Sequence, residues 1–414
     1  MGAGAKCKRF GGDRRAHRKG ETARSAAMNE RLYFDWNATA PLRREASAAV
    51  VAALELVGNP SSIHAEGRAA RRIVEEAREN VAGLAAVEPR NVIFTSGGTE
   101  ANMLALTPAS DGHRAAYARL LVSAVEHISV LAGGRFAASA VERLPVTSSG
   151  QVDLSALDRR LAELSGPVLV SVMLANNETG VVQPVAQVAD LVHRAGGVLH
   201  VDAVQAPGRI SCDINALRAD LLTLSGHKIG GPTGVGALIR RDAAFPFPIP
   251  LMAGGGQERR ARAGTENVLG IAGFGAAAAA TSRGFQAERA HLLLLRERLE
   301  AGLRAQTPEL VVFGAETERL PNTTLFAVPA MKAETAVIAF DLEGVAVSSG
   351  AACSSGKVQP SHVLAAMGVP RRLARAAVRI SFGRSTTESE IDRLIRAWIK
   401  VSGTLLNERV AVAA

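Results

Sequence analysis

Residues 168–202 read VLVSVMLANNETGVVQPVAQVADLVHRAGGVLHVD, and this stretch decides the fold class. An apolar run of strand length at Val168–Leu174 precedes a helical stretch at Val185–Ala195. A second apolar run follows at Gly197–Val201. A strand, a helix and another strand in close succession predict a βαβ unit, whose two strands lie parallel in one sheet.

The same alternation continues on both sides of this stretch. Further strands are predicted at Asn91–Thr95, Arg119–Val125, Leu221–Leu224 and Val235–Ile239, with helices at Arg68–Ala85, Ala101–Thr107 and Leu154–Leu164. The sequence therefore predicts an α/β protein with a mainly parallel sheet flanked by helices.

After residue 285 the pattern changes to short strands mixed with helices. The helix predicted at Ala287–Arg304 leads into this region. Strands are predicted at Val311–Phe313, Thr323–Ala327, Ala346–Val347 and Val378–Phe382, with helices at Ala333–Leu342, Pro360–Met367 and Glu388–Val401. We expect a basic extension at 1–27, a large α/β domain at 28–285 and a smaller α+β domain at 286–414.

Composition excludes several classes of protein. Of 414 residues, 47% are hydrophobic and 21% charged, so disordered, collagen-like and coiled-coil chains are excluded. Aromatic residues make up only 4%, which argues against stacking platforms for single-stranded nucleic acid. The net charge is +9, but residues 1–27 hold eight basic and two acidic side chains. The rest is nearly balanced, so we expect no nucleic-acid binding.

The first 27 residues have no apolar segment of the kind found in secretory signals. We expect a disordered basic tail; a start at Met28 or a transit-like segment are the alternatives. The three cysteines, Cys7, Cys212 and Cys353, form no CxxC pair, which favours a reducing cytoplasm and no zinc site. The Ala- and Gly-rich run at Asn267–Ser282 predicts a buried helix and no membrane span.

Polar segments follow five of the predicted strands. They are Thr95–Glu100, Glu126–His127, Asn176–Gly180, Asp202–Gln205 and Ser225–Lys228. Ligands of open α/β sheets bind outside the carboxyl ends of the strands, so we expect these segments to line one site.

Each of these segments has a functional and a structural interpretation. The glycines and free amides of Thr95–Glu100 suit a phosphate, although Thr99 could simply cap a helix. Lys228 could form a Schiff base, or it could be an exposed loop lysine. Asp202 suits a cation such as a protonated pyridine nitrogen, or it could cap a helix. His127 could stack on a flat cofactor or be a core histidine.

Two candidates lie in the predicted small domain. Cys353 stands among small residues and glycines, where a thiolate could act as a nucleophile; otherwise it is a buried filler. Arg379, in a strand-like run, could bind a substrate carboxylate or form a structural ion pair.

Together these segments resemble the cysteine desulfurases of the class V aminotransferase family. The resemblance rests on Asn176–Gly180, His200–Gln205, Ser225–Lys228, Arg262–Asn267 and Ser348–Cys353, and it extends from about Tyr33 to Ile395. Arg262–Asn267 and the cysteine loop look most like the branch that serves nitrogenase and general iron–sulfur assembly. Ala351, Ser354 and Thr233 depart from common family residues.

The resemblance implies the transferase fold that binds pyridoxal 5'-phosphate (PLP), with L-cysteine as substrate. Lys228 would carry PLP, and Cys353 would become a persulfide and transiently touch a cluster on an iron–sulfur scaffold. His127 would stack on the ring and move protons. The other implied contacts are Gly98, Thr99, Ser225 and His227 for the phosphate, Asp202, Gln205 and Asn177 for the ring, Asn177 and Arg379 for substrate, and Thr265 from the second subunit of a homodimer.

Two further functions remain open at this point. A selenocysteine lyase or another PLP-dependent β-lyase would share the cofactor site, but direct release would not require the relay thiol Cys353. A non-catalytic scaffold for assembly partners would not need Lys228, Asp202, His127 and Arg379 together. The predicted enzyme is thus a cytoplasmic desulfurase that passes sulfur to an acceptor protein.

Overall fold

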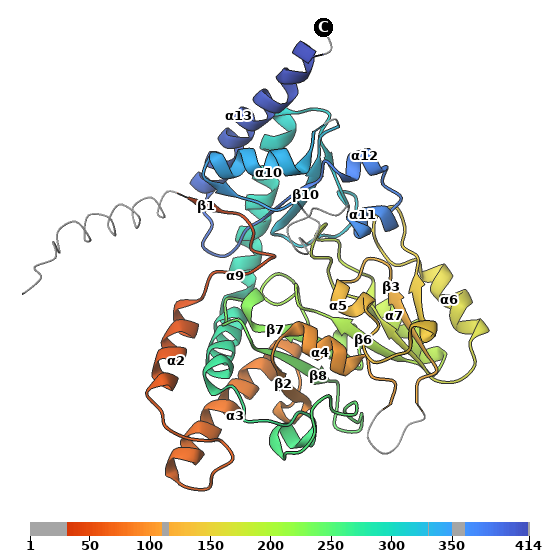
Figure 1. Cartoon of the computed structure of the whole chain (residues 1–414), viewed down its shortest axis with the longest axis vertical. Helices are drawn as coiled ribbons and strands as arrows, with labels where there is room; N and C mark the ends of the chain where they lie inside the picture. The colour runs from red at the N-terminus through yellow and green to blue at the C-terminus, as the bar shows by residue number, and fades with distance from the viewer. Residues whose placement is uncertain (1–30, 110–115, 330, 350–360, 413–414) are drawn as a thin grey trace, which may run out of the picture.

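The computed structural model describes residues 31–109, 116–329, 331–349 and 361–412 (Figure 1). The basic extension, Cys7 and Cys353 lie outside the described residues.

A seven-stranded sheet forms the centre of the larger part of the molecule. Its strands are β2 (Val92–Thr95), β3 (Arg119–Ser123), β4 (Val141–Leu144), β5 (Val168–Ser171), β6 (Val198–Asp202), β7 (Leu221–Ser225) and β8 (Gly236–Arg240). Their order is β2-β8-β7-β6-β5-β3-β4. Only β8 is antiparallel to its neighbours β2 and β7. The prediction of a mainly parallel sheet is therefore confirmed.

Helices cover both faces of this sheet because alternate strand residues point to opposite sides. Leu121 belongs to the core beneath α3 (Ala65–Ala85), α6 (Leu154–Glu163) and α7 (Val185–Arg194). Leu120 packs on the other face, in the core that includes α4 (Gly98–Ala105). Helix α7 buries Val185, Val188, Ala189 and Val192, the 3.6-residue spacing of an apolar stripe.

The smaller part is built on a three-stranded antiparallel sheet. Its order is β12-β10-β9, with β9 at Val311–Val312, β10 at Thr323–Ala327 and β12 at Val378–Ser381. The N-terminal strand β1 (Leu32–Tyr33) pairs in parallel with β11 (Val345–Ala346). The helices are α10 (Ala333–Leu342), α11 (His362–Ala366), α12 (Arg371–Ala374) and α13 (Glu388–Val412). Both ends of the chain thus contribute to the predicted α+β region.

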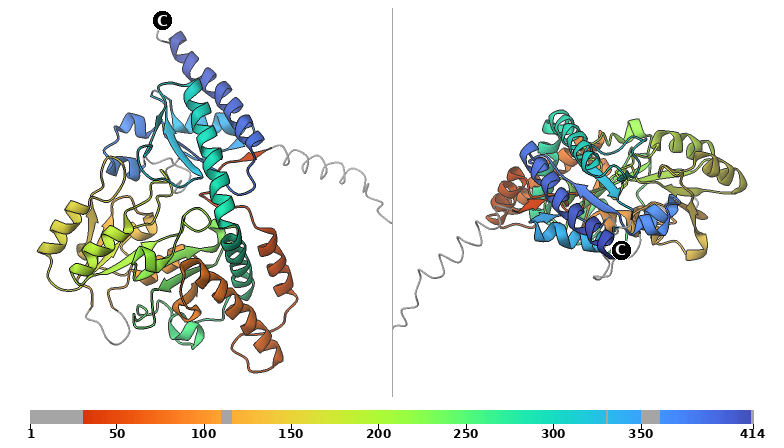
Figure 2. Two further views of the ribbon diagram at one scale, coloured as in Figure 1. Left: turned by 180° about the vertical axis from the view of Figure 1, so that it is seen from behind. Right: turned by 90° about the horizontal axis from the view of Figure 1, so that it is seen from above.

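One helix joins the two parts. Helix α9 (Val268–Gln306) has 39 residues and runs along both parts in Figures 1 and 2. The prediction that a separate helix starts at Ala287 is wrong, because α9 already begins at Val268. No proline interrupts the chain between residues 268 and 306, so the helix continues without a break. Its buried residues up to Ala278 join the large core and those from Leu292 join the small one. The domain limits at 27/28 and 285/286 stay a prediction.

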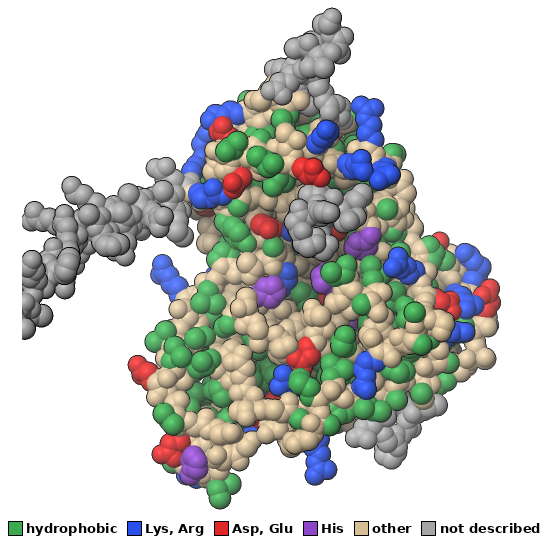
Figure 3. Space-filling model, in the orientation of Figure 1, with side chains coloured by type: hydrophobic (Ala, Val, Ile, Leu, Met, Phe, Trp, Pro, Cys, Tyr) green, Lys and Arg blue, Asp and Glu red, His purple; other side chains and the backbone are tan. Residues whose placement is uncertain are grey.

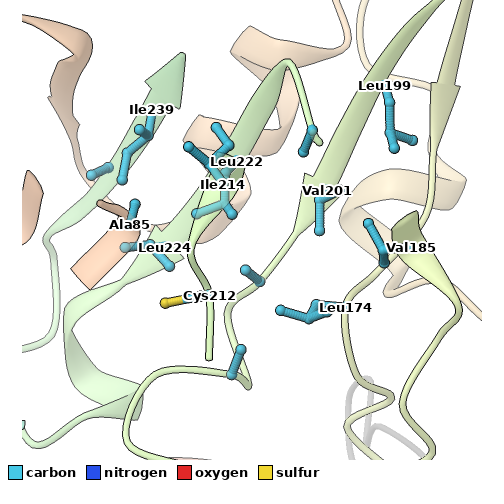
Figure 4. Packing of buried hydrophobic residues seen from close by; sticks show 14 of the residues in the cluster. Ala85, Leu174, Val185, Leu199, Val201, Cys212, Ile214, Leu222, Leu224 and Ile239 are labelled. Atoms are coloured by element: carbon cyan, nitrogen blue, oxygen red, sulfur yellow. The ribbon is translucent and has the colours of Figure 1, made fainter. Parts of the chain in front are cut away.

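Cys212 packs in the large core. Figure 4 shows its sulfur among Ala85, Leu174 and Leu224. It is 3% exposed, and Sγ lies 3.1 Å from the Leu84 carbonyl oxygen. Burial raises the pKa of this thiol to about 12, so Cys212 is an unreactive core residue.

Helix α2 (Arg44–Leu54) and the turn after it expose apolar side chains. Leu54 is 63% exposed, Val57 84% and Ile63 90%.

None of the helices among the described residues has the length and apolar character that a membrane span requires.

Candidate active site

A cavity of about 460 Å³ lies where the large sheet meets the small part. The sequence-predicted residues that line it are Gly98, Thr99, His127, Asn177, Asp202, Gln205, Ser225, His227, Lys228 and Arg379. The carboxyl ends of β2, β6 and β7 supply most of them, as expected for an open α/β sheet. In Figure 3 histidine side chains gather at the waist between the two parts, and on this face basic and acidic groups are interspersed.

The Thr95–Glu100 segment presents free amides to the cavity. Helix α4 begins at Gly98, and its N-cap, Gly97, makes no side-chain cap. The alternative that Thr99 caps this helix is therefore wrong. A Cβ atom on Gly98 would lie 3.0 Å from Val204 Cγ2 and 3.5 Å from Ser225 Cβ, so a side chain here would crowd two residues that line the cavity.

Lys228 is largely buried, and its amine is held by the N-terminal segment. Nζ donates to the carbonyl oxygens of Asn37 (2.6 Å) and Ala38 (2.8 Å). Burial, and after it the positive charges of Arg379 and Arg209, lower the pKa of this amine to about 7. An amine that is partly uncharged at neutral pH can act as a nucleophile, so the exposed-loop interpretation of Lys228 is wrong.

Asp202 is a buried carboxylate without a cation beside it. Oδ2 accepts from Asn102 Nδ2 (2.8 Å) and Oδ1 from the Val204 amide (3.0 Å), so it caps no helix. Among the described residues, Asp202 has no ion-pair partner within 4.0 Å, although it is only 7% exposed. A buried carboxylate of this kind favours a positively charged ligand atom.

His127 begins the short helix α5 (Ile128–Leu131) and also lines the cavity. Its Nδ1 accepts from the Ser129 amide (3.2 Å), which leaves the proton of the neutral ring on Nε2. Burial lowers the pKa of His127, and the carboxylate of Asp202 opposes that shift. His127 is half-buried at the cavity and is no core histidine.

Arg379 makes the structural ion pair and lines the cavity as well. Nη2 donates to Asp35 Oδ1 (2.6 Å) and Nη1 to the Asn177 carbonyl oxygen (2.9 Å). Its buried Nε has no hydrogen-bond partner among the described residues. Arg379 therefore retains a donor that a carboxylate could use.

Gln205 and His227 are held by neighbours from other segments. Gln205 Nε2 donates to the Asn37 carbonyl oxygen (3.0 Å), and Oε1 accepts from Arg209 Nη1. His227 Nδ1 lies 3.1 Å from Thr39 Oγ1, and burial lowers its pKa to about 4.

Asn37 is the main cavity residue that the sequence analysis missed. It is 1% exposed, and its Nδ2 donates to Thr323 Oγ1 (2.9 Å) and to the Asn177 carbonyl oxygen (3.1 Å). It therefore ties the small sheet to the cavity wall. Its signal in the sequence was the polar pair Asp35 and Asn37 after the apolar start of β1.

One predicted residue lies away from the cavity, and another lies outside the described residues. Thr265 lines a separate cavity of about 220 Å³, together with Thr95, Arg262 and Glu266. Its expected role needs a second subunit and stays a prediction. Cys353 lies outside the described residues, and so does the transient metal contact predicted for it.

The residues present fit PLP. Gly98 and the free amides at the start of α4 suit a phosphate group. Asp202 has no cation beside it, and a protonated pyridine nitrogen would supply one. Lys228 offers a partly uncharged amine in the same cavity. The volume of the cavity suits a small-molecule ligand. No group of three His, Cys, Asp or Glu side chains arranged for a metal ion occurs in the described ranges.

Comparison with known proteins agrees with this geometry. The Aminotransferase class-V family matches residues 32–394. A cysteine desulfurase of Cereibacter sphaeroides is 45% identical, covering 88% of this chain and 94% of its own. Cysteine desulfurase 2 of Trichormus variabilis is 41% identical, and the match covers 88% of this chain and 91% of that protein. The solved NifS-like protein from Rickettsia africae superposes with a TM-score of 0.81 at 35% identity, covering 90% and 99%.

The chain therefore belongs to the class V aminotransferases, a family of enzymes, and its relatives of 38–45% identity are cysteine desulfurases. The predicted family, the predicted fold and the expectation of an enzyme are confirmed.

Proposed function

We propose that this chain is a PLP-dependent cysteine desulfurase that converts L-cysteine to L-alanine and carries the sulfur away as a persulfide. The observation that carries the proposal is the lowered pKa of Lys228 in a cavity shared with the unpaired carboxylate of Asp202. The cysteine desulfurases at 38–45% identity support the choice of substrate.

The cofactor would be held by side chains from several strands. Lys228 would bind it covalently, while Gly98, Thr99, Ser225 and His227 would hold its phosphate. Asp202, Gln205, Asn177 and the ring of His127 would contact its ring. When bound, PLP supplies an electron sink next to the substrate α-carbon.

The protein's own groups would position the substrate and move protons. Arg379 and Asn177 would bind the substrate carboxylate, with the free Nε–H of Arg379 as one donor. The Lys228 amine can take up and release a proton near pH 7, and His127 can donate the proton on Nε2.

The sulfur would move to Cys353. Its thiolate attacks the substrate sulfur, the substrate C–S bond breaks, and the former substrate carbon gains a proton to give alanine. The persulfide then passes its outer sulfur to a thiolate of an acceptor protein and leaves Cys353 reduced. Iron–sulfur cluster assembly is the destination that we propose, with Cys353 in transient contact with a cluster on the scaffold.

We further propose a homodimer located in the cytoplasm. Leu54, Val57 and Ile63 are exposed apolar side chains close together in sequence, which supports an interface between copies if they form one patch. In such a dimer Thr265 would complete the phosphate site of the partner.

The function is tested with purified full-length protein, L-cysteine and a reductant, by measuring alanine and sulfide. The expected result is one alanine per sulfide, with loss of both products in Lys228→Ala. Absence of alanine from the loaded wild-type protein would contradict the proposal. Turnover of L-selenocysteine alone would instead support a selenocysteine lyase.

A further inference from the structure

Arg209 is a buried guanidinium that lies behind the active-site wall. It is 6% exposed, and it lines a small neighbouring cavity, not the one that holds the predicted site. Its Nη1 donates to the carbonyl oxygen of Gln205 (3.0 Å) and to Gln205 Oε1. Both acceptors are neutral, and within the described ranges no carboxylate lies at ion-pair distance from Arg209. A buried charge without a counter-ion is costly, which suggests that it has a function.

The first effect of Arg209 falls on the amide of Gln205. Because the guanidinium only donates, it fixes Oε1 of Gln205 on its own side. The NH₂ group then points to the opposite side, where Nε2 donates to the Asn37 carbonyl oxygen. A flipped amide would oppose donor to donor at Arg209 and oxygen to oxygen at Asn37. The bond to Asn37 uses one N–H of the Gln205 amide, so its second N–H is left for a ligand oxygen.

The second effect falls on the amine of Lys228, which donates to the same Asn37 carbonyl oxygen. Burial is the largest cause of the lowered pKa of Lys228, and the positive charges of Arg379 and Arg209 follow. Asp35 and Asp202 act in the opposite direction, and the neighbouring His227 and His127 are neutral.

The two arginines differ in how well their charge is balanced. Asp35 pairs with Arg379 at 2.6 Å and cancels much of its field at a distance. Arg209 has no such partner, so its field acts on the amine without compensation.

We propose that Arg209 is a positioning residue of the active site: it turns the N–H side of Gln205 toward Asn37 and Lys228, and its unpaired positive charge favours the uncharged form of the Lys228 amine. The relevance of this role to catalysis rests on the proposed function. The role itself concerns the protein alone and can be measured without turnover.

The test follows the acetylation of Lys228 against pH in full-length protein freed of cofactor, read by mass spectrometry. In Arg209→Met the midpoint should rise by about half a unit to one unit, and labelling at pH 7 should fall about two- to fivefold. Arg209→Lys should stay close to wild type because it keeps the charge. Arg72→Met, at an exposed position of α3, is the matched control.

Gln205→Leu separates the two effects. It should leave the Lys228 midpoint in place but weaken PLP binding, measured by the absorbance of the bound cofactor. The losses of affinity in Arg209→Met and Gln205→Leu should be less than additive in the double variant, since both act through one amide. If Arg209→Met does not fold, Arg209→Gln takes its place.

Superimposable labelling curves for wild type and a folded Arg209→Met would overturn the proposal, as would strictly additive losses of affinity. A protein that shows the labelling shift but makes no alanine from L-cysteine would support this inference and contradict the proposed function. The two failures are thus distinguishable.

Discussion

Cys212 and Cys353 are expected to differ in reactivity toward the substrate sulfur. Cys212 is buried, with a thiol pKa raised to about 12, so almost none of it is thiolate at neutral pH. Cys353 is the only other cysteine after Cys7 in the sequence. After L-cysteine treatment, mass spectrometry should therefore find added sulfur on the Cys353 peptide and none on the Cys212 peptide.

The matched variants are Cys353→Ser and Cys212→Ala. Cys353→Ser should keep the bound cofactor but lose alanine formation by several orders of magnitude, since a hydroxyl is a far weaker nucleophile than a thiolate. Cys212→Ala should keep turnover and lose about 1 kcal/mol of stability. Undiminished alanine release by Cys353→Ser would favour a direct β-lyase.

At the scale of elements, α11 is attached to the large sheet by a buried acid. Ser361 caps α11 through the Leu364 amide (3.0 Å) and donates its hydroxyl to Glu178 Oε2 (2.5 Å). Burial raises the pKa of Glu178 from 4.5 to about 7. The folded state therefore holds a proton that the unfolded chain releases between pH 4.5 and 7, so the stability from this group falls as pH rises through that window.

Glu178→Gln should flatten this part of the stability profile. The slope removed is on the order of 1 kcal/mol per pH unit. The amide still accepts from Ser361, so the variant should be more stable than wild type above pH 7. Thermal unfolding between pH 5 and 8 measures the pH dependence of stability in both proteins. Glu76→Gln, at an exposed position, is the control. Parallel profiles of wild type and Glu178→Gln would contradict the prediction.

Helix α9 passes close to α3 where glycine leaves room. A Cβ atom on Gly275 would overlap Cα and Cβ of Ala77, whereas one on Gly83 of α3 would meet nothing within 4 Å. We expect Gly275→Ala to destabilise the protein by about 1–3 kcal/mol and Gly83→Ala to stabilise it by about 0.5–1 kcal/mol. Urea unfolding of both variants measures the change in the free energy of unfolding, which should have opposite signs. Equal changes in the two variants would show that the close approach of α9 to α3 is unimportant.

The elements that the sequence predicted best are those with a strong local pattern. The apolar runs that became β5, β6 and β7, and the polar segments after them, follow from local composition. The reversed direction of β8 was not predicted, because an apolar run carries no sign of direction. The ten residues between β7 and β8 are too few for a crossover helix, which explains the antiparallel pairing.

The site was predictable only in part for the same reason. Lys228 and Asp202 stand directly after apolar strands, so their positions could be inferred from the sequence alone. Asn37 and Arg209 act through hydrogen bonds to Lys228 and Gln205. The polar pair Asp35 and Asn37 is a weak local signal, and no local pattern marks Arg209. Their importance depends on contacts between distant segments, which only the folded chain specifies.

At the scale of the whole molecule, the match to the family begins at residue 32, close to β1. We expect removal of residues 1–27 to leave turnover, dimerisation and the unfolding temperature unchanged, since none of the predicted site residues lies there. Activity assays, light scattering and calorimetry on the shortened chain measure this. A large loss of activity would show that the extension takes part in the fold or the site.

The pair between Asp35 and Arg379 joins residues 344 positions apart. During synthesis, Lys228, which follows β7, leaves the ribosome long before β12, which carries Arg379. Contacts of such separation form late, because the closure entropy of the intervening chain opposes them. A nascent chain that ends before β12 therefore carries Lys228 but lacks Arg379 and the strand that holds it. If the chain binds PLP as we propose, translation beyond β12 is needed before the whole site can form.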